Sequence, residues 1–80
     1  MDRETATKTV FEYLVEHFEV DKDKVALDAN LFADLDLDSI DALDMAGLFE
    51  SKLGVRVSED ELRDLRTVSD VVEYLLRNAP

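Results

Sequence analysis

The sequence predicts an all-α protein, a small up-down bundle of three main helices plus one short helix. Apolar residues recur at the three-and-four spacing of a helical face, and a capping residue precedes each of the last three helical segments. Two glycines and one proline, the terminal Pro80, leave helix formation almost uninterrupted. At 80 residues we expect a single domain over residues 1–80. Because it has no cysteine, its stability must come from packing of its hydrophobic residues, which are 46% of the chain.

The first helix is expected from Arg3 to Phe18. Its apolar face comprises Ala6, Val10, Phe11, Leu14 and Phe18. A long connection follows over residues 19–38, and in so small a domain it needs apolar contacts of its own. The candidates for these contacts are Val25, Leu27, Leu31, Phe32, Leu35 and Leu37. Residues 28–31 are predicted to form a single helical turn.

Three capping pairs mark the starts of the remaining helices. In each pair a short polar residue precedes the helix and an acidic residue follows three positions later. The pairs are Asp38 with Asp41, Ser58 with Glu61, and Thr67 with Asp70. They predict helices over Ser39–Leu53, over Glu59–Leu65 and from Thr67 onward. Arg77 lies near the end of the last helix, where a basic side chain suits the negative end of the helix dipole. Gly54 fits the stop of the first of these, because glycine accepts the left-handed conformation common at helix ends.

The helix over residues 39–53 carries two apolar faces when its residues are placed at 100° intervals. The core face holds Ala42, Met45, Ala46, Phe49 and Leu53. A smaller patch on another side holds Ile40, Leu43 and Gly47, bordered by Asp44, Glu50 and Ser51. A surface helix needs only one apolar stripe, so the second patch either docks a partner or packs beneath the preceding loop. Periodicity alone leaves both interpretations open.

Acidic residues dominate the charge of the chain. Asp and Glu total 20 against 9 Lys and Arg, the formal net charge is −11, and residues 25–51 contain no Lys or Arg. Such a chain repels nucleic acid and anionic membranes and favours partners with basic patches. No apolar run suits a signal peptide or a membrane span. We therefore expect a cytoplasmic protein that does not insert into membranes, and we expect a monomer.

Two chemical alternatives fail on residue spacing. An EF-hand calcium loop beginning at Asp34 requires glycine at its sixth position and glutamate at its twelfth, where Ser39 and Met45 stand. Catalysis by Ser39 would need a general base, but the single histidine lies on another predicted helix and no G-x-S-x-G motif surrounds the serine. We therefore expect no metal site, beyond weak binding of divalent ions by the acidic cluster, and no enzymatic activity.

Residues 34–41, Asp-Leu-Asp-Leu-Asp-Ser-Ile-Asp, resemble the signature of the acyl carrier protein family. In that family an Asp-Ser-Leu or Asp-Ser-Ile triplet opens the second helix, and the resemblance in element order covers nearly the whole chain. It implies that Ser39 receives 4'-phosphopantetheine from coenzyme A through a phosphodiester bond, and that Asp38 helps the modifying enzyme position coenzyme A and magnesium. The thiol of this arm would hold acyl intermediates of fatty acid, polyketide or related lipid biosynthesis as thioesters, and the protein itself would catalyse nothing.

The resemblance also assigns two surfaces to this chain. Partner docking falls to Ile40, Asp41, Leu43, Asp44, Gly47 and Glu50. The implied partners are a phosphopantetheinyl transferase, acyl synthases, transferases and reductases with basic patches. An acyl chain would enter a pocket in the core, whose implied lining is Phe11, Leu31, Phe32, Met45, Ala46, Phe49, Val57, Leu62, Val71 and Leu75.

Three departures from the family pattern stand out. Asp36 and Leu37 occupy positions where the family often has glycine, so we expect a different loop geometry before the serine. Gly47 replaces a bulky apolar residue on the docking face, and Ile40 stands where leucine is commoner. These differences indicate a carrier dedicated to a particular pathway. Two alternatives stay open, a peptidyl or aminoacyl carrier for non-ribosomal synthesis and an unmodified acidic interaction module.

Overall fold

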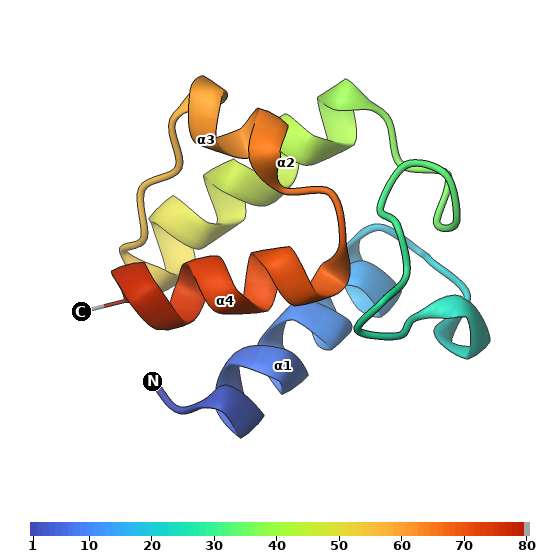
Figure 1. The fold of residues 1–80 in the computed structure, drawn as a ribbon, viewed down its shortest axis with the longest axis horizontal. Coiled ribbons are helices and arrows are strands. Elements are labelled where there is room, and N and C mark those ends of the chain that lie inside the picture. The colour runs from blue at the N-terminus through green and yellow to red at the C-terminus, as the bar shows by residue number, and fades with distance from the viewer. Residues whose placement is uncertain (80) are drawn as a thin grey trace.

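Helices form the fold in the computed structural model, which describes residues 1–79 (Figure 1). In chain order the elements are α1 (Arg3–Glu12), the π-helical turn η1 (Tyr13–His17), the 3-10 turn η2 (Lys22–Lys24), α2 (Ser39–Leu48), the π-helical turn η3 (Phe49–Leu53), α3 (Glu59–Asp64) and α4 (Val68–Asn78). The only β-type pairing in the described residues is an isolated bridge between Asn30 and Thr67. The predicted all-α bundle of three main helices and one short helix is confirmed.

The predicted helix starts are confirmed together with their caps. The Asp38 carboxylate accepts a hydrogen bond from the Asp41 N–H at 2.9 Å, and the Asp41 carboxylate accepts one from the Asp38 N–H at 3.2 Å. The Ser58–Glu61 and Thr67–Asp70 pairs close the same two-way contact before α3 and α4. Gly54 ends η3 with a left-handed φ of 67°. Local capping chemistry therefore decides where these three helices begin.

The first two helices end in wider turns that the sequence pattern did not predict. η1 continues α1 and η3 continues α2, and each is π-helical. Their rings meet, because Tyr13 of η1 and Phe49 of η3 stack with centroids 5.8 Å apart. The predicted helix ends otherwise lie within one residue of the observed ones. The first helix ends at His17 and not at Phe18, and α3 ends at Asp64 and not at Leu65.

The long connection is held by backbone hydrogen bonds to the segment that leads into α4. The Leu31 N–H donates to the Arg66 carbonyl at 2.8 Å, and the Val68 N–H donates to the Ala29 carbonyl at 3.1 Å. The predicted helical turn over residues 28–31 is wrong, since Asn30 sits in the bridge to Thr67 and the turn follows over residues 31–35. The Asn30 side chain stabilises this later turn by accepting hydrogen bonds from two backbone N–H groups, each at 2.9 Å.

Most of the predicted apolar contacts of the connection form. Leu31, Leu35 and Leu37 are buried, and Val25 is half-buried. Leu27 and Phe32 are instead 46% and 40% exposed, so two of the predicted contacts leave a substantial apolar surface in solvent. Phe32 nevertheless also lines an apolar cavity in the core, which is described below.

Asp36 takes a backbone conformation usually reserved for glycine. Its φ is 57°, in the left-handed region, at one of the two positions where the family often has glycine. Aspartate is among the few other residues that tolerate this region. The missing glycine therefore does not exclude a left-handed residue in the loop before Ser39.

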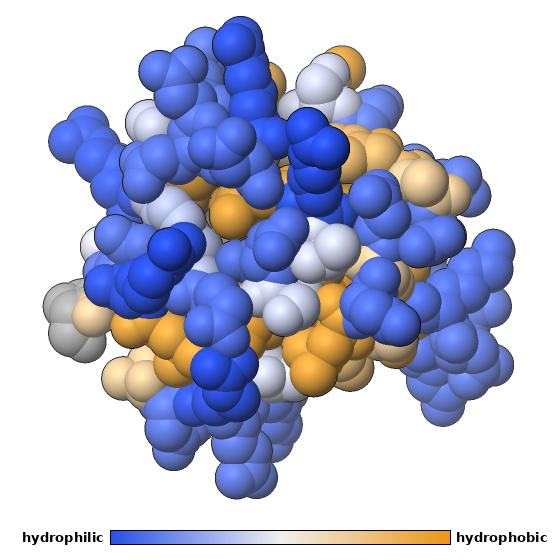
Figure 2. All heavy atoms as spheres, viewed as in Figure 1, coloured by the Kyte–Doolittle hydropathy of each residue, from blue (hydrophilic) through white to orange (hydrophobic). Residues whose placement is uncertain are grey.

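The core joins α1, α2, η3 and α4 with the long connection. α4 packs along α1, and α3 packs against α2. The largest fully buried side chains of the core are Phe49, Leu14, Leu75, Val10, Val55, Val68, Val71 and Val72. α3 contributes no fully buried residue of its own. On the face shown in Figure 2, hydrophilic side chains cover most of the surface and apolar atoms show between them.

Candidate functional site

Ser39 is the first residue of α2 and is exposed to solvent. Asp38, and not Ser39, caps the helix, so the serine hydroxyl is left out of the capping box. Among the described residues this hydroxyl takes part in no hydrogen bond to the protein, whereas the hydroxyls of Ser51, Ser58 and Thr67 do. The Ser39 oxygen is therefore free to be esterified without breaking the helix start.

The Ser39 side chain opens onto a groove between α2 and α3. The groove has a volume of about 240 Å³ and its lining consists of Phe32, Ser39, Ala42, Leu43, Glu59, Leu62 and Arg63. Its surface is mainly apolar, with one acid and one base contributed by α3. An elongated group bonded to Ser39 would thus find an apolar floor beside it.

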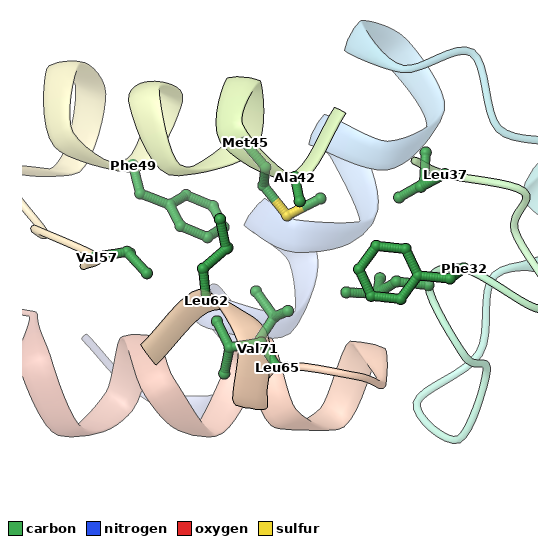
Figure 3. Close-up of a pocket in the computed structure, with 10 residues that line it drawn as sticks. Phe32, Leu37, Ala42, Met45, Phe49, Val57, Leu62, Leu65 and Val71 are labelled. Carbon is green, nitrogen blue, oxygen red and sulfur yellow. The ribbon is translucent and has the colours of Figure 1, made fainter. Parts of the chain in front are cut away.

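A second, enclosed cavity lies behind this groove, in the core (Figure 3). It is lined by apolar side chains alone: Leu31, Phe32, Leu37, Ala42, Met45, Phe49, Val57, Leu62, Leu65 and Val71. In Figure 3 these side chains converge from α2, η3, α3, α4 and the segments that connect them. The volume in which the centre of a water molecule can move is only about 10 Å³, so the cavity holds one water molecule at most. An acyl chain therefore needs the cavity to expand.

The predicted pocket lining is partly placed here by the structure. Leu31, Phe32, Met45, Phe49, Val57, Leu62 and Val71 line the cavity. The other three predicted residues do not line it. Phe11 packs against the core from α1, and Leu75 is fully buried in another part of the core. Ala46 follows Met45 directly in the helix, so its side chain points in a different direction. Leu37, Ala42 and Leu65 line it although the prediction omitted them.

Three side chains form the wall between the groove and the cavity. Phe32, Ala42 and Leu62 line both spaces, so the two spaces are neighbours that share this layer of side chains. Phe32 is 40% exposed and Leu62 belongs to the short α3, so two of the three lie on weakly buried parts of the fold. Displacing this layer would join the groove beside Ser39 to the core.

The second apolar patch of α2 faces solvent. Ile40 is 67% exposed and Leu43 is 52% exposed, and Gly47 is exposed one turn further on. The interpretation that this patch packs beneath the preceding loop is therefore wrong. Asp44 and Glu50 are exposed around it and Asp41 is half-buried. The guanidinium of Arg56 comes no closer than 4.0 Å to the carboxylate of Glu50, so it neutralises little of the negative charge around the patch.

α3 is tied to α4 by a polar contact of Tyr74. The Tyr74 hydroxyl lies 2.8 Å from the Arg56 carbonyl oxygen and 2.9 Å from Oε2 of Glu61, and these two acceptors share its single proton. The Ser58 hydroxyl and then the Tyr74 hydroxyl lower the pKa of Glu61 by bonding its charged form. Burial, followed by the hydrogen bond that its hydroxyl donates to Glu61, raises the pKa of Tyr74. This contact sets the position of the helix that forms one groove wall.

Arg63 and Glu59 are groove residues that the sequence prediction missed. Both belong to α3 and stand one turn apart, on the same side of the helix as Leu62. The i, i+4 spacing was visible in the sequence, but nothing local indicated that this side of α3 faces Ser39. Within residues 1–79, no group of three or more His, Cys, Asp or Glu side chains is arranged to hold a metal ion.

The exposed serine at a helix start, beside a groove that backs onto an apolar cavity, defines a small carrier domain. A family model described as "Phosphopantetheine attachment site" matches residues 8–75. The acyl carrier protein of Petrotoga mobilis is 37% identical over 75 residues, 94% of this chain and 88% of that protein. The acyl carrier protein of Lactobacillus acidophilus is 33% identical over 75 residues, 94% of each chain. This chain belongs to the acyl carrier protein family.

A solved structure supports the same assignment. The acyl carrier protein from Enterococcus faecalis matches with a TM-score of 0.81 and 28% identity, covering 99% of this chain and 100% of that one. The protein is accordingly a carrier and not an enzyme, and its prosthetic group is 4'-phosphopantetheine. It interacts with biosynthetic enzymes and with acyl groups. None of the helices in the described part of the chain has the length and apolar character that crossing a bilayer requires.

Proposed function

We propose that Ser39 is the residue that carries 4'-phosphopantetheine. The observation that carries this proposal is the free, exposed Ser39 hydroxyl beside the groove, with the helix cap supplied by Asp38 instead. When bound, the group supplies a flexible tether that ends in a thiol, which none of the side chains of this chain offers. Asp38 stands next to the serine with an exposed carboxylate, which fits a role in recognition by the modifying enzyme.

The cargo is best explained as an acyl chain. The side chains that line the enclosed cavity contain only carbon and sulfur heavy atoms. An aliphatic chain can therefore take the place of contacts between these side chains without leaving a polar group unpaired. A charged aminoacyl group would meet no partner there, which favours an acyl carrier over the aminoacyl alternative. α3 has no fully buried residue, so its displacement together with Phe32 is the least costly way to enlarge the cavity.

The exposed patch of α2 is the proposed docking surface. Ile40 and Leu43 offer apolar contact, and the acids around them attract basic residues at a partner's entrance. The partners that fit are a phosphopantetheinyl transferase and the acyl synthases, transferases and reductases of fatty acid, polyketide or related lipid biosynthesis. We place this function in the cytoplasm, in a monomer in which residues 1–80 form one carrier domain.

Intact-mass spectrometry tests the attachment site. The protein is incubated with coenzyme A and a promiscuous phosphopantetheinyl transferase, and the wild type is expected to gain one phosphopantetheine. Ser39→Ala should gain none. Ser51→Ala is the matched control, since Ser51 is also exposed and belongs to the same continuous helix, and it should gain one group like the wild type. A full gain in Ser39→Ala contradicts the proposed site, and no gain in the wild type with several transferases favours an unmodified interaction module.

A further inference from the structure

Arg63 is a cation in the groove that Ser39 opens onto. It extends from α3, is exposed, and is the one basic side chain among the residues that line this groove. The ion pairs formed within residues 1–79 are Arg3–Glu73 and Arg56–Glu50, so no carboxylate of the described chain lies within ion-pair distance of the Arg63 guanidinium. Even Glu59, which lines the same groove one turn earlier, is not paired with it. The groove therefore contains an uncommitted positive charge.

The surroundings of Ser39 otherwise repel an anion. Asp38 and Asp41 flank α2's first turn, and each carboxylate accepts a backbone N–H of the other residue. The Asp41 N–H at the helix start is therefore already occupied, which leaves less of the helix N-terminus for another anion. No Lys or Arg occurs from residue 25 to residue 51 to offset these acids. An anion bonded to Ser39 needs its counter-charge from elsewhere in the fold.

We propose that Arg63 is a positioning residue that pairs with the phosphodiester carried by Ser39. The inference rests on the proposed attachment site. A guanidinium presents a planar fork of donors that matches two phosphate oxygens, and such charge-assisted pairs are shorter and stronger than neutral hydrogen bonds. Pairing across the groove directs the prosthetic group over Phe32, Ala42 and Leu62, the three side chains that separate the groove from the cavity. Arg63 thereby places the bound group at the entrance to the core.

Phosphorus NMR of the modified protein tests this pairing. Wild type, Arg63→Gln and Arg66→Gln are each converted to the phosphopantetheine form, verified by intact mass, and compared at low salt. Arg66→Gln is the matched control, because Arg66 is also exposed, carries the same charge and lies three residues further on, but does not line the groove. The ³¹P resonance is expected to shift by more than its line width in Arg63→Gln and to stay at the wild-type position in Arg66→Gln.

A second readout uses the arginine itself. In a ¹H–¹⁵N spectrum the Nε–Hε signal of Arg63 should move when wild type is modified, and this change should shrink at about 1 M NaCl, where the screening length is about 3 Å. An unmoved Arg63 signal, or equal ³¹P resonances in all three proteins, overturns the pairing while the mass gain leaves the attachment site intact. Equal ³¹P shifts in both variants also overturn it, since a general charge effect then suffices. A wild type that gains no mass overturns the attachment site and the pairing together.

Discussion

The two glycines of the chain are expected to respond in opposite directions to the same substitution by alanine. Gly47 lies inside α2, and Gly54 caps η3 with a φ of 67°. A Cβ atom added at either position meets no heavy atom within 4 Å apart from the adjacent residues and the nearby backbone of its own helix, so neither substitution causes a clash. The backbone conformation alone therefore decides the sign of each effect.

The two magnitudes follow from that conformation. Gly47→Ala replaces a poor helix former with the best one and should stabilise the protein by about 1 kcal/mol. Gly54→Ala forces a side chain into the left-handed region and should destabilise it by about 1–2 kcal/mol. In a domain of this size 1 kcal/mol corresponds to about 4–8 °C in Tm. The two variants should therefore melt on opposite sides of the wild type.

Urea unfolding followed by far-UV circular dichroism measures both free energies of unfolding. The dependence on urea concentration should stay the same, because neither change alters the surface exposed on unfolding. The double variant should lie near the sum of the single effects, since about 10 Å of helix separates the positions. A lower midpoint for Gly47→Ala would refute the open space at this position. A neutral Gly54→Ala would refute the argument that the left-handed conformation is what requires glycine.

Three further outcomes are expected. Ile40→Ser should lower the kcat/KM of a phosphopantetheinyl transferase about tenfold, whereas Leu27→Ser, an exposed apolar residue outside the patch, should leave it unchanged. Tyr74→Phe should cost about 1 kcal/mol in thermal unfolding, because it removes the hydroxyl that bonds the Arg56 carbonyl, and an unchanged Tm would refute that role. Backbone N–H groups lower the pKa of Asp70, so its stabilising effect is complete above about pH 4 and is lost as the pH falls through the lower folded value. Asp70→Asn should therefore flatten the acid decline of the urea midpoint, and an equally steep decline would contradict this.

Acid sensitivity also follows from the other carboxylates that are held in the folded state. The N–H and hydroxyl of Thr5 lower the pKa of Asp2, and Arg3 lowers the pKa of Glu73. Asp2 is exposed and the side chain of Glu73 is 44% exposed, so each makes a small contribution that salt reduces. Each contribution has the same sign as that of Asp70, because a depressed pKa in the folded protein stabilises it only while the carboxylate is charged.

The helix starts, including the one at Ser39, could be predicted from the sequence because the forces that set them are local. A cap and its partner are three residues apart, so they can pair without help from distant parts of the chain. Asp38 and Asp41 pair in this way, with hydrogen bonds of 2.9 and 3.2 Å. The exposed patch of α2 also followed from local geometry, because the angle between two side chains on a helix depends only on their spacing. The sequence pattern therefore identified Ile40 and Leu43 as a separate face before their exposure was known.

Whether that face was covered depended on the path of the long connection, which no local pattern determines. The connection is held by pairing with residues far along the chain, Asn30 with Thr67 and Leu31 with Arg66, and this pairing leaves Ile40 in solvent. The turn predicted over residues 28–31 was wrong for the same reason. A distant backbone segment outcompeted the local helical turn for the hydrogen bonds.

The sequence by itself determined an acidic helical chain with a capped helix that begins at Ser39, because periodicity, caps and charge act over a few residues, and the carrier role came from the resemblance of residues 34–41 to a known family. Only the tertiary structure decided what lies around that serine. It brought Leu37, Ala42 and Leu65 to the cavity, and it brought Arg63 to the groove beside a residue 24 positions earlier in the chain. The physical reason is that helix packing, which brings together side chains distant in sequence, depends on the shape of the whole core and not on any one segment.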